Sequence, residues 1–144
     1  MAFNYADYAS NPTVYSPAAK SVMCKSFKID IAAGSGGTSA TVYTIGYLPK
    51  GAQLVHGGVW ATTAVSGSSV TSATLAVTVG GRNFFNGSNV FAAGALTAPS
   101  SAVYYQNIDT VTQSDAAVTY TLTLGGGGTV ATAGVIYIAL LYVM

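Results

Sequence analysis

The sequence predicts an all-β protein, namely an antiparallel β-sandwich with a jelly-roll-like strand order and an extended N-terminal arm. Segments that alternate apolar and polar side chains recur along the chain from about residue 22. Such alternation is typical of strands with one buried face. Gly, Ser, Asn and Pro separate these segments, as turns do in sandwiches and barrels. No stretch has the periodicity of an amphipathic helix.

The length and the scarcity of charge limit the possible organisation. A chain of 144 residues corresponds to one domain, and we divide it into an arm, residues 1–21, and a β-sandwich domain, residues 22–144. Only 6% of the residues are charged and none is Glu, whereas an ordinary globular domain has about 25% charged residues. Soluble monomers normally use charge to resist association. The composition therefore favours a protein that is packed against neighbours, with a Ser/Thr-coated secreted domain as the alternative.

The N-terminal arm is rich in aromatic residues. Pro12 and Pro17 interrupt it, and it follows neither helical nor strand periodicity. Disordered tails usually contain few aromatic residues, and Tyr supplies a large contact area at low entropic cost. We predict that the arm lies on a partner or on a neighbouring subunit, or alternatively that it folds back over its own sandwich. Its candidate contact residues are Phe3, Tyr5, Tyr8 and Tyr15.

The first predicted strand covers Val22–Ala32. Phe27, Ile29 and Ile31 share one face, while polar residues alternate with them on the other. Cys24 lies in the same strand and is the only cysteine, so an intramolecular disulfide is impossible. We expect it to be a small buried residue.

Val42–Thr63 reads as two strands joined by Leu48-Pro49-Lys50-Gly51. Pro at the second position and Gly at the fourth are typical of a type I turn. Two β-runs joined by about four residues with turn chemistry predict a hairpin. Trp60, near the end of this segment, is interpreted as a core residue between the sheets.

Further strands follow. Leu75, Val77 and Val79 are expected to point inward from Ala73–Gly80, and Ala117–Leu124 alternates in the same way. A short strand is predicted at Ser101–Asn107. Val135–Val143 is apolar on both faces, which predicts a strand that is central in a layer or covered by another chain. Gly80–Ala98 has no regular pattern and reads as a long connection, where binding surfaces often occur.

The residues give little support for catalysis. His56 is the only histidine, and with a single cysteine the chain lacks the ligands of a usual zinc site. His56 is more easily explained as a packed or interfacial imidazole than as part of a Ser-His-Asp triad. Asp109 and Asp115 are expected to bond their own backbone in turns. The glycine runs lack the Lys-Ser/Thr ending of a phosphate loop. We therefore expect no enzymatic activity, no cofactor and no metal.

Charge and hydropathy also disfavour some partners. A net charge of +1 gives no reason to expect nucleic acid as the main partner, because phosphate binding needs clustered Lys and Arg. Lys20, Lys25 and Lys28 cluster only loosely, and we interpret them as solvated lysines on an edge strand. The apolar C-terminal run is too short for a membrane helix, and the N-terminus has no secretory signal pattern. We expect neither membrane insertion nor export.

The segment Val42–Gly94 resembles small structural proteins of tailed bacteriophage heads. The similarity is carried by TIGYLPKGAQLVHGGVW, SATLAVTVGG and NFFNGSNVFAAG. The resemblance implies a jelly roll or sandwich that decorates or cements the capsid exterior, made in the cytoplasm of a bacterial host. It implies the major capsid protein as a partner and a homo-oligomer, with a trimer favoured over a dimer. Besides the arm residues, the expected contact residues are Phe84, Phe85, Phe91, Tyr104 and Tyr105.

Two alternatives remain open. The chain could be a carbohydrate- or receptor-binding jelly-roll module of a phage fibre, with Trp60, Tyr104 and Tyr105 as a platform on which sugars stack. It could also be a tail or neck component.

Overall fold

The computed structural model describes residues 22–94, 96–97 and 115–144. Within these ranges every regular element is a strand, which confirms the all-β prediction. The strands are β1 (Met23–Asp30), β2 (Val42–Leu48), β3 (Gln53–Ser66), β4 (Ser72–Val79), β5 (Arg82–Asn89), β6 (Leu96–Thr97), β7 (Ala116–Gly125) and β8 (Ala133–Val143). The predicted arm (residues 1–21) and the predicted strand at 101–107 lie outside the described residues.

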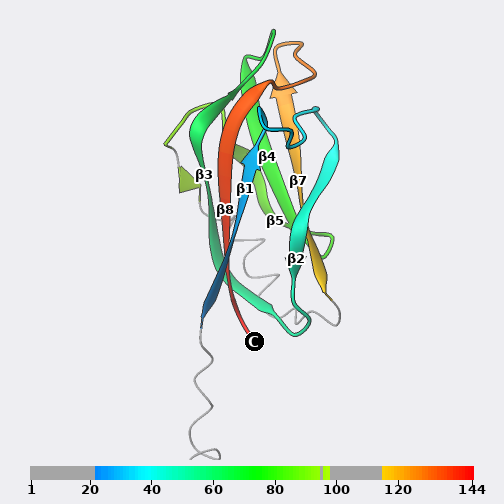
Figure 1. The fold of residues 1–144 in the computed structure, drawn as a ribbon, viewed down its shortest axis with the longest axis vertical. Coiled ribbons are helices and arrows are strands. Elements are labelled where there is room, and N and C mark those ends of the chain that lie inside the picture. The colour runs from blue at the N-terminus through cyan, green and yellow to red at the C-terminus, as the bar shows by residue number, and fades with distance from the viewer. Residues whose placement is uncertain (1–21, 95, 98–114) are drawn as a thin grey trace, which may run out of the picture.

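The strands form two four-stranded sheets, in the orders β1-β8-β3-β6 and β2-β7-β4-β5. They face each other as a sandwich (Figure 1). All strand pairs are antiparallel, and the pairing is nested: β1 with β8, β2 with β7, β3 with β6 and β4 with β5. A long hairpin rolled across two sheets has this pairing, which is consistent with the predicted jelly-roll-like order.

The core fills the space between the sheets and follows the predicted alternation. Leu75 and Val77 of β4 and Tyr120 and Leu122 of β7 are almost completely buried. Ile138 of β8 lies opposite Phe27 of β1 on one side and Val59 of β3 on the other, and all three side chains are buried. Burial of this apolar surface is the main stabilising contribution to such a sandwich.

The predicted hairpin at residues 42–63 is wrong. β2 pairs with β7, whereas β3 pairs with β8 and β6, so the connection passes from one sheet to the other. The turn is also shifted by one residue, because the Ala52 amide donates to the Pro49 carbonyl oxygen at 3.1 Å. Gly51 then occupies the third turn position with φ +87°. A positive φ at this position is typical of a type II turn and favours glycine.

Residues 82–89 form a strand, which corrects the prediction of an irregular connection. Gly80 and Gly81 have φ values of +59° and +80° and close a hairpin between β4 and β5. Positive φ at both central residues is the requirement of a type I′ turn. Asn86-Gly87, a dipeptide typical of tight turns, is part of β5, at a register shift between the residues that pair with Leu75 and Val77.

β8 lies between β1 and β3, so the prediction of a central strand is confirmed. Cys24 is exposed, which contradicts the expectation of burial. Buried Phe27 and Ile29 fix the inward face of β1, and Cys24 falls on the opposite face. The residue is therefore directed away from the core.

Candidate interaction surfaces

The outward face of the β1-β8-β3 sheet is a regular array, which we call the outer β8 face. Ile136, Ile138 and Leu140 point into the core, so the alternate residues of β8 point outward. The register places each of them between one residue of β1 and one of β3. The four rows of this face are Asp30–Val135–Thr63, Lys28–Tyr137–Trp60, Ser26–Ala139–Gly58 and Cys24–Leu141–His56.

Trp60 belongs to this outer face and not to the core. Its neighbours Val59 and Ala61 are buried with exposed fractions of 1% and 0%, so Trp60 points to the other side of the sheet. It stacks on Tyr137, with 5.6 Å between ring centroids and 14° between ring planes. Trp60 is half-buried. The interpretation of Trp60 as a core residue between the sheets is therefore wrong.

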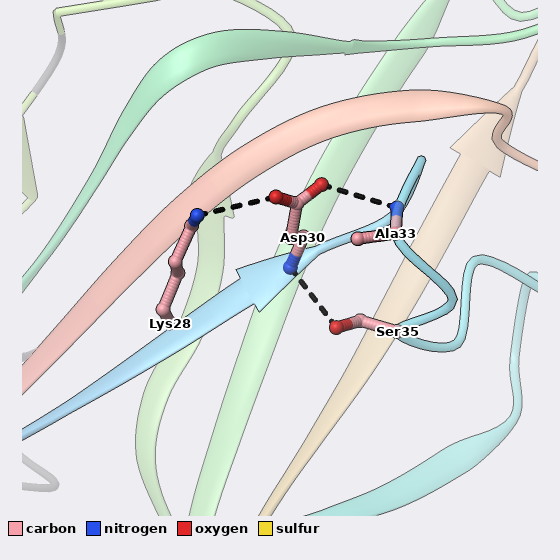
Figure 2. A network of polar contacts seen from close by, with 4 residues as sticks. All are labelled: Lys28, Asp30, Ala33 and Ser35. Atoms are coloured by element: carbon pink, nitrogen blue, oxygen red, sulfur yellow. Dashed lines mark hydrogen bonds and ion pairs between the residues drawn. The ribbon is translucent and has the colours of Figure 1, made fainter.

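The charges near this face are engaged locally. The Lys28 ammonium lies 3.2 Å from a carboxylate oxygen of Asp30. The other oxygen of Asp30 accepts a hydrogen bond from the Ala33 amide at 3.2 Å, and the Asp30 amide donates to the Ser35 hydroxyl at 3.0 Å (Figure 2). Asp30 thereby organises the start of the β1–β2 loop. An exposed ion pair of this kind contributes at most about 1 kcal/mol to the free energy of unfolding. The main structural role of Asp30 is therefore to hold the loop through its hydrogen bonds.

The outward face formed by β2, β7 and β4 of the other sheet is dominated by threonine and carries no charged residue, and we call it the threonine face. Val118, Tyr120 and Leu122 of β7 are buried, which directs the intervening threonines outward. The hydroxyls of Thr78 and Thr119 are hydrogen-bonded across β4 and β7. The outward residues of β2, β7 and β4 include Val42, Thr44, Tyr47, Thr74, Ala76, Thr78, Ala117, Thr119, Thr121 and Thr123, of which Val42 and Tyr47 are exposed apolar or aromatic side chains.

The loops at one end of the sandwich form a third surface, which we call the loop end. It consists of residues 31–41, 67–71, 90–94 and 126–132. These residues include no Asp, Glu, Lys or Arg. Three of its loops lie together at the top of Figure 1. Backbone hydrogen bonds join them: Ser39 amide to Thr129 oxygen at 2.8 Å, Ala131 to Gly37 at 2.9 Å and Gly128 to Ser69 at 3.1 Å. The loops therefore support one another.

A buried tyrosine adds a side-chain tie to the loop end. The Tyr120 hydroxyl donates to the Gly36 carbonyl oxygen at 2.8 Å, and its ring stacks on Tyr43 with 5.3 Å between centroids. Burial, together with the neighbouring Tyr43, raises the pKa of Tyr120 to about 12. Hydrogen bonding by Thr38 lowers the pKa of Tyr43 from its ordinary value.

The predicted contact residues have different outcomes. Phe84 and Phe85 are in the core, with exposed fractions of 0% and 1% and an edge-to-face contact between their rings. This placement corrects the expectation that they form a contact surface. Phe91 is 39% exposed, and its amide donates to the Asn89 side chain at 2.9 Å. Its contact role stays a prediction. The remaining predicted contact residues, Phe3, Tyr5, Tyr8, Tyr15, Tyr104 and Tyr105, lie outside the described residues.

The described residues gather no group of three or more His, Cys, Asp or Glu side chains that could hold a metal ion. His56 is exposed on the outer β8 face. Asp115 accepts a hydrogen bond from the Lys50 amide at 3.0 Å and so braces a turn that is distant in sequence. Asp109 lies outside the described residues. Within those ranges no helix is long and apolar enough to cross a membrane.

The fold is similar to that of chains from two phage capsids. A chain of the capsid of Ralstonia phage GP4 aligns with a TM-score of 0.62 and 18% identity, over 86% of this chain and 84% of that one. A chain of the cyanophage Pam1 capsid aligns with a TM-score of 0.63 and 20% identity, over 87% and 86%. No protein-family model matches the sequence, and no curated protein matches it. At these identities the likeness establishes the fold.

Proposed function

We propose that this chain is a non-enzymatic structural protein of a bacteriophage virion, and more specifically a decoration or cement protein on the capsid exterior. The main observation behind this proposal is the similarity in fold to chains of two phage capsids. In each comparison the similarity extends over most of both chains. The neutral threonine face and loop end support an assembled state, because depletion of charge is typical of the core of protein interfaces.

In the proposed mechanism, the protein binds where subunits of the major capsid protein meet. A ligand that binds an assembled state better than its separated parts stabilises the assembly by mass action. We propose that the chain also associates with itself, as a trimer or a dimer, and that it is made in the cytoplasm of a bacterial host. Phe91, which is 39% exposed at the loop end, is our proposed contact residue among those described.

Co-sedimentation with purified capsid shells tests this function. We expect stoichiometric recovery with assembled shells and little recovery with dissociated capsid subunits. Phe91→Ala should weaken the recovery, whereas Met144→Ala, which changes a residue that is 47% exposed at the C-terminus, at the opposite end of the sandwich from the loop end (Figure 1), serves as the matched control. A wild-type chain that stays in the supernatant with intact shells would rule out the cement role.

A carbohydrate-binding module is the second candidate, and the outward position of Trp60 is the observation that favours it. Trp60 and Tyr137 form a stacked pair on an outer face, and aromatic side chains of this kind combine an apolar body with a polar tip. A glycan array with the wild-type chain and Trp60→Ala separates the two functions. Saturable binding to a defined glycan that Trp60→Ala abolishes would favour the receptor-binding role over cement.

A further inference from the structure

The outer β8 face is apolar at its centre although it points away from the core. Val135, Tyr137, Ala139 and Leu141 form its middle column. All eight described strands belong to the two sheets, so no described strand forms a third layer over this column. An outward sheet face that remains in water normally carries polar side chains, as the threonine face does. The composition of β8 therefore calls for a covering segment.

Residues 1–21 have the composition of such a segment. They contain four aromatic residues and only Asp7 and Lys20 as charged residues. Aromatic rings would meet Trp60 and Tyr137 on the face, and aromatic pairs contribute about 0.5–1.5 kcal/mol beyond their burial. Between the Tyr137 row and the Leu141 row lie Ser26, Ala139 and Gly58, whose small side chains allow a ring to approach the sheet.

The arm is also long enough. It joins β1 at the end of the sheet where Met23 pairs with Tyr142. The Tyr137 row lies five residues further along β8, which corresponds to about 17 Å at the usual strand rise. Tyr15 precedes Met23 by eight residues, enough for roughly 26 Å of extended chain. The aromatic residues before Tyr15 reach further still.

The local sequence favours a neighbouring copy over the same copy as the source of the arm. To cover its own sheet, the arm would have to reverse direction immediately before β1. Of the five residue types that dominate tight turns, Gly, Pro, Asn, Asp and Ser, residues 18–22, Ala-Ala-Lys-Ser-Val, contain only one, Ser21. Pro12 and Pro17 favour extended backbone in the residues that precede them. An arm that stays extended before β1 would lead away from its own sheet and toward another molecule.

We propose that residues 1–21 of one copy lie along the outer β8 face of a neighbouring copy, with their aromatic side chains against Trp60 and Tyr137. This inference rests on the self-association included in the proposed function and does not require a capsid shell. The arm thereby links copies by exchange, and each copy both gives and receives an arm.

Trp60 is the only tryptophan of the chain, so its fluorescence reports on this face alone. Deletion of residues 2–16 should raise the acrylamide quenching constant of Trp60, because the half-buried ring loses its cover and becomes accessible to the quencher. The same deletion should lower the mass measured by sedimentation to that of a monomer. Should the deletion impair folding, the full-length variant with Phe3, Tyr5, Tyr8 and Tyr15 all changed to Ser should give the same two results.

A mixing experiment identifies the source of the arm. The deletion variant, which keeps Trp60 but lacks the arm, is mixed with full-length Trp60→Phe, which has the arm but no tryptophan. Restored protection of Trp60 supports the proposal, because only the other copy can supply the arm. If the deletion exposes Trp60 to acrylamide and mixing does not protect it again, the arm covers its own chain. That result would overturn the proposed exchange. Quenching unaffected by the deletion would exclude the arm as the cover.

These outcomes are independent of the cement role. A shell that fails to recruit the wild-type chain contradicts the proposed function, while the Trp60 measurements in shell-free solution decide the arm exchange by themselves.

Discussion

Removing the Tyr120 hydroxyl with Tyr120→Phe tests how firmly the loop end is tied to the core. The ring is 1% exposed, and its hydroxyl donates to the Gly36 carbonyl oxygen at 2.8 Å, across 84 positions of sequence. Phe keeps the ring and its stacking on Tyr43. The substitution therefore removes the hydrogen bond and little else.

The expected loss follows from the surroundings of Gly36. A net hydrogen bond contributes about 0.5–1.5 kcal/mol, and an acceptor left buried without a partner costs about 1–3 kcal/mol. Gly36 is half-buried, so water can replace part of the lost bond, and we expect the free energy of unfolding to fall by about 1–1.5 kcal/mol. For a chain of 144 residues, this corresponds to a Tm lower by roughly 4 °C.

The pH dependence gives a second, independent signature. Burial raises the pKa of Tyr120 from 10.0 to about 12. Below pH 10 the hydroxyl is protonated in both states, and its stabilisation is fully present. Between pH 10 and 12 the unfolded chain releases the proton more readily than the folded chain, so stability falls as pH rises. Tyr120→Phe lacks this loss, and the gap between the two proteins should narrow across that range.

Urea denaturation followed by far-UV circular dichroism, at pH 7 and at several values up to pH 11, measures both effects. Tyr43→Phe is the matched control, because its hydroxyl accepts an exposed bond of 3.3 Å from the Thr38 amide and its removal should cost less. A Tyr120→Phe protein with the wild-type midpoint at pH 7, or with the wild-type decline above pH 10, would refute the reasoning.

Three further predictions concern the core and the proposed complex. Leu122→Ala truncates a side chain with 0% exposure and should lower the free energy of unfolding in urea by about 2–5 kcal/mol, whereas a loss below about 1 kcal/mol would contradict its central place. A Cβ at Gly57 would lie 2.6 Å from the Ala139 carbonyl oxygen and 2.9 Å from Phe84 Cε1, so Gly57→Ala should lower the free energy of unfolding by about 1–3 kcal/mol. The control Thr123→Ala, at an exposed position, should stay within about 0.5 kcal/mol of wild type. Salt raised to several hundred millimolar should barely release the protein from shells, since little charge is available for screening, and release at moderate salt would count against the proposed contacts.

Period-two alternation predicted the inward residues of β4 and β7 but failed where strands contain bulges. The register of β3 shifts between Leu54 and His56, so Leu54 and Val59 are both buried although their positions differ in parity. A β-bulge inserts one extra residue and reverses the alternation beyond it. This reversal explains why Trp60 was misplaced. The buried pair Phe84 and Phe85 breaks the alternation of β5 in the same way, which concealed a strand.

The local sequence also could not predict to which of the two sheets a strand belongs. Turn chemistry correctly indicated a reversal near Pro49 and Gly51, but the same local sequence serves a hairpin or a passage between sheets. Only long-range pairing, of β2 with β7 and β3 with β8, distinguishes them. The apolar character of Val135–Val143, by contrast, reflects the burial of a central strand and was sufficient to predict its place.

The distribution of polar groups indicates whether the protein associates through its sheet faces or through its strand edges. The β1 edge carries Lys25, which donates to the Tyr47 carbonyl oxygen of the other sheet at 2.6 Å, and the β2 and β5 edges contain register shifts. Inward-directed charges and bulges both discourage the addition of another strand. A protein that only needed a neutral coat would carry polar residues on both outer faces. The threonine face is mainly hydroxyl-bearing, with Val42 and Tyr47 exposed among the threonines, whereas the middle column of the outer β8 face, Val135, Tyr137, Ala139 and Leu141, has no Thr or Ser. This asymmetry supports a protein whose edges resist pairing while one face is covered by another segment.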